Sequence, residues 1–458
     1  MNINVKKTLV SVPLSLSLLI PAAGSISASA STMNGNMMMS PSASIASPAA
    51  NLRADLDSLL SEHAYLAIIT MQKGAKGAKD FQAAANALNQ NTDNLSKAVA
   101  SVYGEQAGMQ FKQIWGSHIG YFVDYVKATV AKNDAAKQKA MKNLNSYTIT
   151  QADFFSKATG GRLSAAQLEE GLKMHVQDLL DAFNNYVAGN YTAAYMNVRE
   201  AISHMYTPGK GLSWAITQQF PSKFNHSTVD TPAVELREKL NYLLSEHAAL
   251  AITAMQKGGD GAKDFQAAAA ALNNNTMDLS NAIASVYGSA AGKQFQQIWS
   301  SHIGYFVDYV KATGNKDTKG KDMAISNLNS YRVKQAQFLS TATGGRLKVA
   351  DLEAGLKTHV DELLYAFNSY EAGNYTATYS EVNTAYMHMF MVGQGLASAI
   401  VSQFPSKFES SMPSKMPKTG LTPPAEHNST NTVAEWTVIG LALSSILAAM
   451  MIRRKKTN

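Results

Sequence analysis

The sequence predicts an all-α protein built from two tandem copies of one helical bundle. Apolar residues recur every three or four positions through most of the chain, and no stretch alternates with a period of two over the length of a strand. The stretch SHIGYFVDYVKAT stands at 117–129 and again, unchanged, at 301–313, an offset of 184 residues that other matches share. A unit of about 175 residues is as long as a domain, so we expect two domains rather than a solenoid of short repeats.

The two repeats are expected at residues 51–224 and 234–408, joined by a linker at 225–233. Proline is nearly absent inside them and the loops are short, which favours an up-and-down bundle of about six to seven helices in each repeat. The low-complexity segments 31–50 and 409–432 have no core to bury, and we expect them to be disordered stalks.

Seven amphipathic stretches in the first repeat are separated by glycines or by capping residues, and each predicts one helix. In chain order they run from Leu52 to Gly74, Phe81 to Gly104, Gly104 to Lys132, Asp134 to Gly160, Ser164 to Gly189, Tyr191 to Met205 and Leu212 to Phe220. Asp134 and Ser164 are the expected N-caps of the fourth and fifth helices, because their side chains can accept hydrogen bonds from the first turn.

The two ends of the chain predict export. Two lysines precede an apolar stretch and a small-residue cleavage site, so residues 1–30 are expected to be a secretory signal peptide. Residues 433–452 are nearly all apolar and long enough to form one transmembrane helix. The basic tail 453–458 follows, which the positive-inside rule keeps in the cytoplasm. The rest of the chain is then expected outside the cell.

A short motif stands just before the expected membrane span, and its residues are Met416, Pro417, Lys418, Thr419 and Gly420. A pentapeptide, an apolar span and a basic tail in this order resemble the LPxTG-like cell-wall sorting signal of Gram-positive surface proteins, which a sortase reads. The usual pentapeptide starts with Leu, where this chain has Met416. The resemblance implies cleavage after Thr419 and attachment of Thr419 to peptidoglycan. A single-span membrane protein is the alternative.

Charge and cysteine content narrow the classes of function. The formal net charge is +7. The signal segment and the segment after Thr419 contribute +2 each, so the remaining residues carry +3. Positive and negative residues are interspersed along this remaining part. This distribution is not that of a nucleic-acid-binding protein. The chain has no cysteine, so neither disulfides nor thiolate metal sites are available.

Histidines stand in the middle of three expected helices in each repeat, on apolar stripes. Those of the first repeat are His63, His118 and His175, and those of the second are His247, His302 and His359. Helices that pack side by side bring their midpoints to one level, so we expect the three rings of each repeat to meet in a polar layer.

Such a layer suits a metal ion, because three neutral imidazoles from separate helices can bind copper, zinc or iron. Asp178 and Glu362 each follow the last histidine of their repeat by three residues and could supply a fourth ligand or an outer hydrogen-bond acceptor. Glu62 and Glu246 adjoin a histidine in sequence but point about 100° away from it, so they are weaker candidates.

The same histidines could instead be structural, bonded to one another, to Thr92, Tyr147 or Tyr121, or to the backbone. His204 lies about 160° from the centre of its stripe, and we expect it to be exposed. A haem would need a cavity where the stripes carry Leu, Phe and Tyr, and the spacings of hemerythrin and ferritin ligands are absent.

The stretches SEHAYLA, SHIGYFVDYV and PSKF make the repeats similar to helical exported repeats of Gram-positive bacteria that are sometimes labelled copper amine oxidase. That enzyme family is built on a large β-sandwich with a tyrosine-derived quinone, which this chain does not match, so its activity is not carried over. The sequence predicts a non-enzymatic, wall-anchored extracellular protein with a histidine-lined metal site in each repeat. The alternatives are an adhesin or spacer that binds a protein or matrix partner, and a metal-dependent oxidase.

Overall fold

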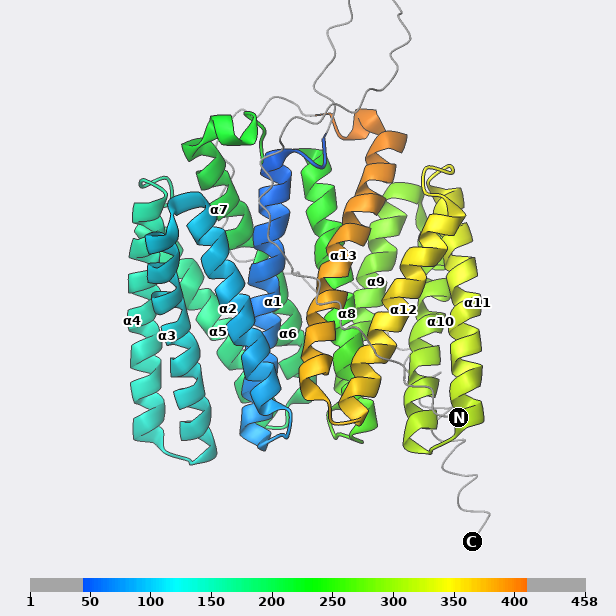
Figure 1. Cartoon of the computed structure of the whole chain (residues 1–458), viewed down its shortest axis with the longest axis horizontal. Coiled ribbons are helices and arrows are strands. Elements are labelled where there is room, and N and C mark those ends of the chain that lie inside the picture. The colour runs from blue at the N-terminus through cyan, green and yellow to red at the C-terminus, as the bar shows by residue number, and fades with distance from the viewer. Residues whose placement is uncertain (1–43, 410–458) are drawn as a thin grey trace, which may run out of the picture. The chain divides into compact units, whose positions relative to one another are not determined.

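The computed structural model describes residues 44–409, which are helical almost throughout and contain no strand, so the all-α prediction is confirmed (Figure 1). The helices of repeat 1 are α1 (Pro48–Lys76), α2 (Phe81–Tyr103), α3 (Glu105–Val130), α4 (Asp134–Ala158), α5 (Ala165–Val187), α6 (Tyr191–His204) and α7 (Tyr206–Gln219). Those of repeat 2 are α8 (Pro232–Gly259), α9 (Phe265–Tyr287), α10 (Ser289–Gly314), α11 (Thr318–Ala342), α12 (Val349–Glu371) and α13 (Tyr375–Gln403). A short 3-10 helix follows each set, η1 (Pro221–Phe224) and η2 (Pro405–Lys407).

Several expected segments lie outside the described residues. They are the signal peptide 1–30, the sorting motif 416–420, the membrane span 433–452 and the basic tail 453–458. Among residues 44–409, no helix combines the length and the apolar character that crossing a membrane requires.

The first helix begins inside the segment that the sequence assigned to a disordered stalk, 31–50. The side chain of Ser47 accepts a hydrogen bond from the backbone N–H of Ala50, and Pro48 takes the first helical position, where its missing N–H costs nothing. Ile45 is also buried, and its carbonyl accepts a hydrogen bond from Arg237 of repeat 2. The end of the expected stalk is therefore part of the folded unit.

The capping residues are nearly where the sequence predicts them. Asn133, not Asp134, caps α4: its side chain accepts a hydrogen bond from the backbone N–H of Ala136 at 3.0 Å, and Asp134 is the first helical residue. Ser164 caps α5 as expected. The fourth helix ends before Gly160 and Gly161, whose φ angles of 60° and 74° lie in the left-handed region that favours glycine.

The repeats differ at one helix. Repeat 2 has a single helix, α13, where repeat 1 has α6 and α7, and α7 begins at Tyr206 rather than at the expected Leu212. Pro208 stands where repeat 2 has Val392. Proline lacks a backbone N–H and its ring clashes with the carbonyl four residues earlier, at His204, where α6 ends. One substitution thus accounts for the extra helix of repeat 1.

The first helix of each repeat packs against most of the other helices of that repeat. Helix α1 packs against α2, α3, α5, α6 and α7, and α8 packs against α9, α10, α12 and α13. Of the 29 residues of α1, 23 are buried, which leaves this helix no solvent-facing side along most of its length. The central helices therefore touch both the core of their own repeat and the neighbouring repeat.

The two repeats pack on each other through equivalent contacts, and all described residues belong to one compact unit. Tyr195 of α6 donates a hydrogen bond to Asp264 at 2.8 Å, and the equivalent Tyr379 of α13 donates to Asp80 at 2.9 Å. Each aspartate also pairs with a buried lysine of its own repeat. The two copies therefore use the same surface, as the halves of a two-fold dimer do.

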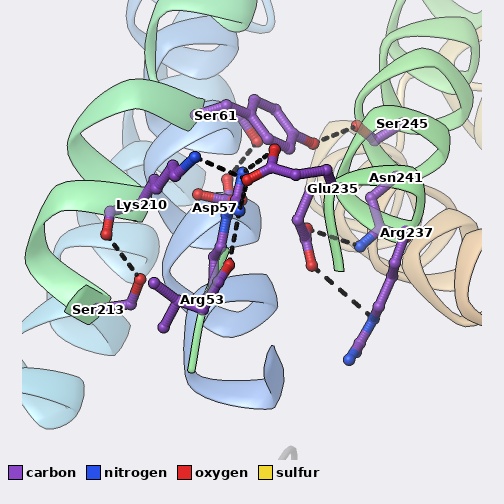
Figure 2. Close-up of polar contacts among 12 residues, drawn as sticks. Arg53, Asp57, Ser61, Lys210, Ser213, Glu235, Arg237, Asn241 and Ser245 are labelled. Atoms are coloured by element: carbon purple, nitrogen blue, oxygen red, sulfur yellow. Dashed lines mark hydrogen bonds and ion pairs between the residues drawn. The ribbon is translucent and has the colours of Figure 1, made fainter. Parts of the chain in front are cut away.

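A partly buried polar network joins α1 to α8 (Figure 2). Arg53 donates to both carboxylate oxygens of Glu235, at 2.7 and 3.1 Å, and to the carbonyl of Val229 at 2.8 Å. Asp57 lies one turn further along α1 and is completely buried. Burial raises the pKa of Asp57 well above its usual range, and the neighbouring Glu238 raises it further, so this carboxyl can keep a proton inside the interface.

Replacing Arg53 with alanine is expected to lower the free energy of unfolding by about 3 kcal/mol, because it removes the donor that serves the Glu235 carboxylate and a buried carbonyl. Urea unfolding would measure the change. The matched control is Lys173→Ala, whose ion pair with Glu169 is largely exposed and should contribute less than about 0.5 kcal/mol. An Arg53→Ala effect as small as that of the control would contradict a stabilising role for the network.

Candidate metal centre

Three helices of each repeat bring one histidine each to the same point. Triad 1 consists of His63 from α1, His118 from α3 and His175 from α5, and triad 2 consists of His247 from α8, His302 from α10 and His359 from α12. Within each triad, one nitrogen of every ring lies within 4.8 Å of those of the other two. The rings meet at mid-helix as the sequence predicts, and both triads could hold a metal ion.

Both triads are buried, and no ring is more than 3% exposed. Loss of hydration disfavours the charged imidazolium, so burial lowers the pKa of every ring, to about 4 for His118 and about 3 for His302 and His359. For His63, the neighbouring His118 and His175 lower the pKa further. All six rings are therefore neutral near pH 7, which is the form of imidazole that binds a metal.

A backbone hydrogen bond fixes which nitrogen of His118 faces the triad. Its Nδ1 donates to the carbonyl of Trp115, one turn earlier on the same helix. With the proton on Nδ1, Nε2 carries a lone pair that points into the triad, where it lies 3.1 Å from Nε2 of His63 and can accept its hydrogen bond. His302 has the same two partners at the equivalent positions of repeat 2. Metal-binding histidines commonly donate a hydrogen bond from the other ring nitrogen to such a carbonyl.

Several ring nitrogens have no hydrogen-bond partner within residues 44–409. They are Nδ1 of His63 and both nitrogens of His175, with the same atoms of His247 and His359 in triad 2. A buried polar group without a partner costs about 1–3 kcal/mol. The structural interpretation explains the bonds of His118 to His63 and to the carbonyl of Trp115, but it leaves His175 without a partner within the described residues, and Thr92 donates to a carbonyl of its own helix. A metal ion would give His175 a partner.

The triad is close to the size that a metal ion requires. In a tetrahedral site with metal–nitrogen bonds of about 2.1 Å, the ligand nitrogens are about 3.4 Å apart. The pair His63–His118 is already near this spacing at 3.1 Å, and the upper bound of 4.8 Å requires a ring to shift by about 1 Å. Three neutral nitrogens without sulfur suit Zn²⁺ and Cu²⁺.

The expected acidic ligands do not join the triads, whose members are histidines alone. Asp178 pairs with Nδ1 of His204 at 2.6 Å, and Glu362 pairs with His388 at 2.8 Å. Three residues turn a helix by about 300°, so the side chain of Asp178 points about 60° away from that of His175 and towards α6. His204 is correspondingly not exposed as expected, because its side chain keeps only 15% of its accessible surface.

The acidic residues next to the triads face the other repeat, in keeping with their weaker candidacy. Glu62 accepts hydrogen bonds from Asn91 at 2.8 Å and from Asn383 of repeat 2 at 2.6 Å. Glu246 accepts two from Arg199 of repeat 1, both at 3.0 Å. These carboxylates therefore belong to the contact between the repeats.

Aromatic rings enclose each triad. The centroid of the Trp115 ring lies 4.8 Å from that of His63 and 4.9 Å from that of His118. Tyr147 of α4 stacks on His118 at 4.5 Å, with 16° between the planes. Trp115 is not among the residues that the sequence predicts for the site, although it precedes His118 by three residues and so shares its helix face. A tryptophan in contact with two candidate ligands gives the site an optical reporter.

Comparison of the chain with protein-family models, with curated proteins and with solved structures gives no match. Function is therefore inferred from the triads and their surroundings.

The metal-free protein should lose stability as the pH falls below about 6.5, because the unfolded rings take up protons at their ordinary pKa while the buried ones stay neutral to about pH 4. Each histidine contributes a slope of about 1.4 kcal/mol per pH unit near pH 5. The double variant His118→Gln/His302→Gln should make the slope shallower by about 2.7 kcal/mol per pH unit in denaturant titrations at several pH values. His226→Gln, on an exposed loop residue, is the control. An unchanged slope in the double variant would show that these rings titrate normally.

Proposed function

We propose that the protein is an exported, cell-wall-anchored protein that binds one transition-metal ion in each of its two repeats. The observation that carries the proposal is the meeting of three neutral, buried imidazoles, of which His175 has no hydrogen-bond partner in the part of the chain that the structure describes. Burying imidazole rings without hydrogen-bond partners destabilises the fold. A metal ion that binds their lone pairs would offset this loss of stability.

The donor set favours copper or zinc over iron. Non-haem iron sites commonly combine two histidines with a carboxylate, and both Asp178 and Glu362 are engaged by other histidines. Among divalent ions, Cu²⁺ has the highest intrinsic affinity for nitrogen ligands, and Zn²⁺ accepts a tetrahedral site without preference of its own. We therefore propose Cu²⁺ or Zn²⁺.

A metal-dependent oxidase is the second candidate. Three protein ligands leave one coordination position open, as in catalytic zinc sites, and this observation favours chemistry at the ion. Release of peroxide on addition of amines to the copper-loaded protein would support it. Binding or storage is preferred because the triads contain no carboxylate to act as a base.

The proposed location at the cell wall rests on the sequence. The motif Met416–Gly420 precedes the apolar stretch 433–452, and together they resemble a sorting signal that would join Thr419 to peptidoglycan. Repeats 51–224 and 234–408 would then be displayed outside the cell, behind the stalk 409–432.

The adhesin alternative would need an exposed surface for a partner protein. Most large apolar side chains that are exposed in one repeat have no apolar equivalent in the other, as at Met109 with Lys293 and Tyr365 with Asp181, and among residues 44–409 only Ile149 and Val333 form an exposed equivalent pair. A function present in both copies is therefore better supported by the triads than by these side chains.

After dialysis against Cu²⁺ or Zn²⁺ and removal of loosely bound metal, elemental analysis should find about two ions per chain. His118→Ala should reduce the content to about one, because it removes one ligand from triad 1 alone. Cu²⁺ should also quench tryptophan fluorescence, because Trp115 and Trp299 lie beside the rings.

Two controls accompany this measurement. His204→Ala removes a histidine that pairs with Asp178, and His226→Ala removes an exposed one, so both should keep two ions. No ion retained after exposure to Cu²⁺, Zn²⁺ and Fe²⁺, or equal loss in all three histidine variants, would refute the triads as metal sites.

A further inference from the structure

Each repeat has an apolar pocket between its first three helices, beside the triad. The pocket of repeat 1 has a cavity volume of about 370 Å³ and lies between α1, α2 and α3. The pocket of repeat 2 has about 350 Å³ and lies between α8, α9 and α10. Equivalent residues line the two, such as Met71 and Met255 or Phe122 and Phe306. These volumes fall in the range of small-molecule sites.

The lining is almost wholly apolar, with one charged side chain at the same position of each repeat. In repeat 1 the polar side chains of the lining are Thr70 and Lys127. Lys311 is the equivalent lysine in repeat 2. Both lysines are exposed, stand in the last turn of their helix, and form no ion pair within residues 44–409. An apolar hollow with a cation at its edge is complementary to a molecule with an apolar chain and an anionic head.

We propose that each pocket binds a free fatty carboxylate of medium chain length, with the chain against the apolar wall and the head group at Lys127 or Lys311. Burial of the chain removes methylene groups from water, which favours binding in proportion to the area covered. The exposed ammonium group attracts the carboxylate without having to give up an existing ion pair.

The pocket of repeat 2 reaches the candidate metal site, because His302 is part of its lining. The pocket of repeat 1 extends to Ile119 and Phe122, which follow His118 by one and four residues on the same helix. A bound chain would thus lie close to the triad. The binding energy comes from the apolar wall and the lysine, so the proposal does not depend on the metal.

One difference distinguishes the pockets. The carboxylate of Glu371 lies against Gly259, a residue of the lining in repeat 2, whereas repeat 1 has Val187 at the position equivalent to Glu371. A second anion near the mouth weakens the attraction for a carboxylate. Repeat 1 is therefore expected to be the tighter site.

Isothermal titration of the full chain with decanoate, in the presence of EDTA, tests the proposal without the metal. We expect saturable binding of about two decanoates per chain. Val123→Trp and Val307→Trp each place a large side chain in one pocket at a half-buried position, and the double variant should bind none. Met109→Trp, at an exposed position of the same helix α3 outside the lining, should bind two.

The head group is tested with Lys127→Gln/Lys311→Gln, which should weaken decanoate binding about threefold to fivefold and leave the binding of uncharged decanol unchanged. Lys142→Gln, an exposed lysine of α4, is the control. Absence of saturable decanoate binding, or equal binding by the double tryptophan variant and the wild type, would overturn the pocket assignment. Equal affinity of the lysine variant and the wild type for decanoate would overturn the role of the lysines.

Discussion

Each repeat holds three imidazole rings in the middle of its helical core, where the loss of hydration of a polar ring has to be offset by a neighbouring group. The bond from His118 to the carbonyl of Trp115 and its contact with His63 account for part of this requirement. His175 has no such partner among the described residues. Burial keeps the rings neutral, the backbone bond orients one lone pair inwards, and the remaining lone pairs lack a partner. An ion bound at the centre, as proposed, would satisfy all of these conditions together.

The central helix of each repeat serves both the candidate metal site and the contact between the repeats. In α1, His63 faces the core of its own repeat while the adjacent Glu62 bonds to Asn383 of the other. Further along the same helix, Arg53 reaches Glu235 at the start of α8. The position of each triad is therefore tied to the packing of the two copies. The reciprocal bonds from Tyr195 and Tyr379 repeat this arrangement about an approximate two-fold relation.

Sequence periodicity is sufficient to predict most of the helices along the chain and the meeting of three histidines in each repeat, because helix length and the position of a residue along a helix are local properties. Periodicity does not predict where a side chain bonds to a residue of another helix. Asp178 lies at a spacing that suits a ligand, yet the partner that engages it, His204, comes from another helix and was expected to face solvent. The packing of the repeats on each other was not predicted either, since Arg53, Asp57 and Glu62 look like solvated residues until the second copy covers them.

X-ray absorption at the metal edge of the copper- or zinc-loaded protein would test coordination by the three histidines, because it reports the atoms bound to the ion. We expect three imidazole nitrogens at about 2.0–2.1 Å and the multiple-scattering pattern of histidine rings. A spectrum dominated by oxygen ligands, with one histidine or none per ion, would contradict this coordination.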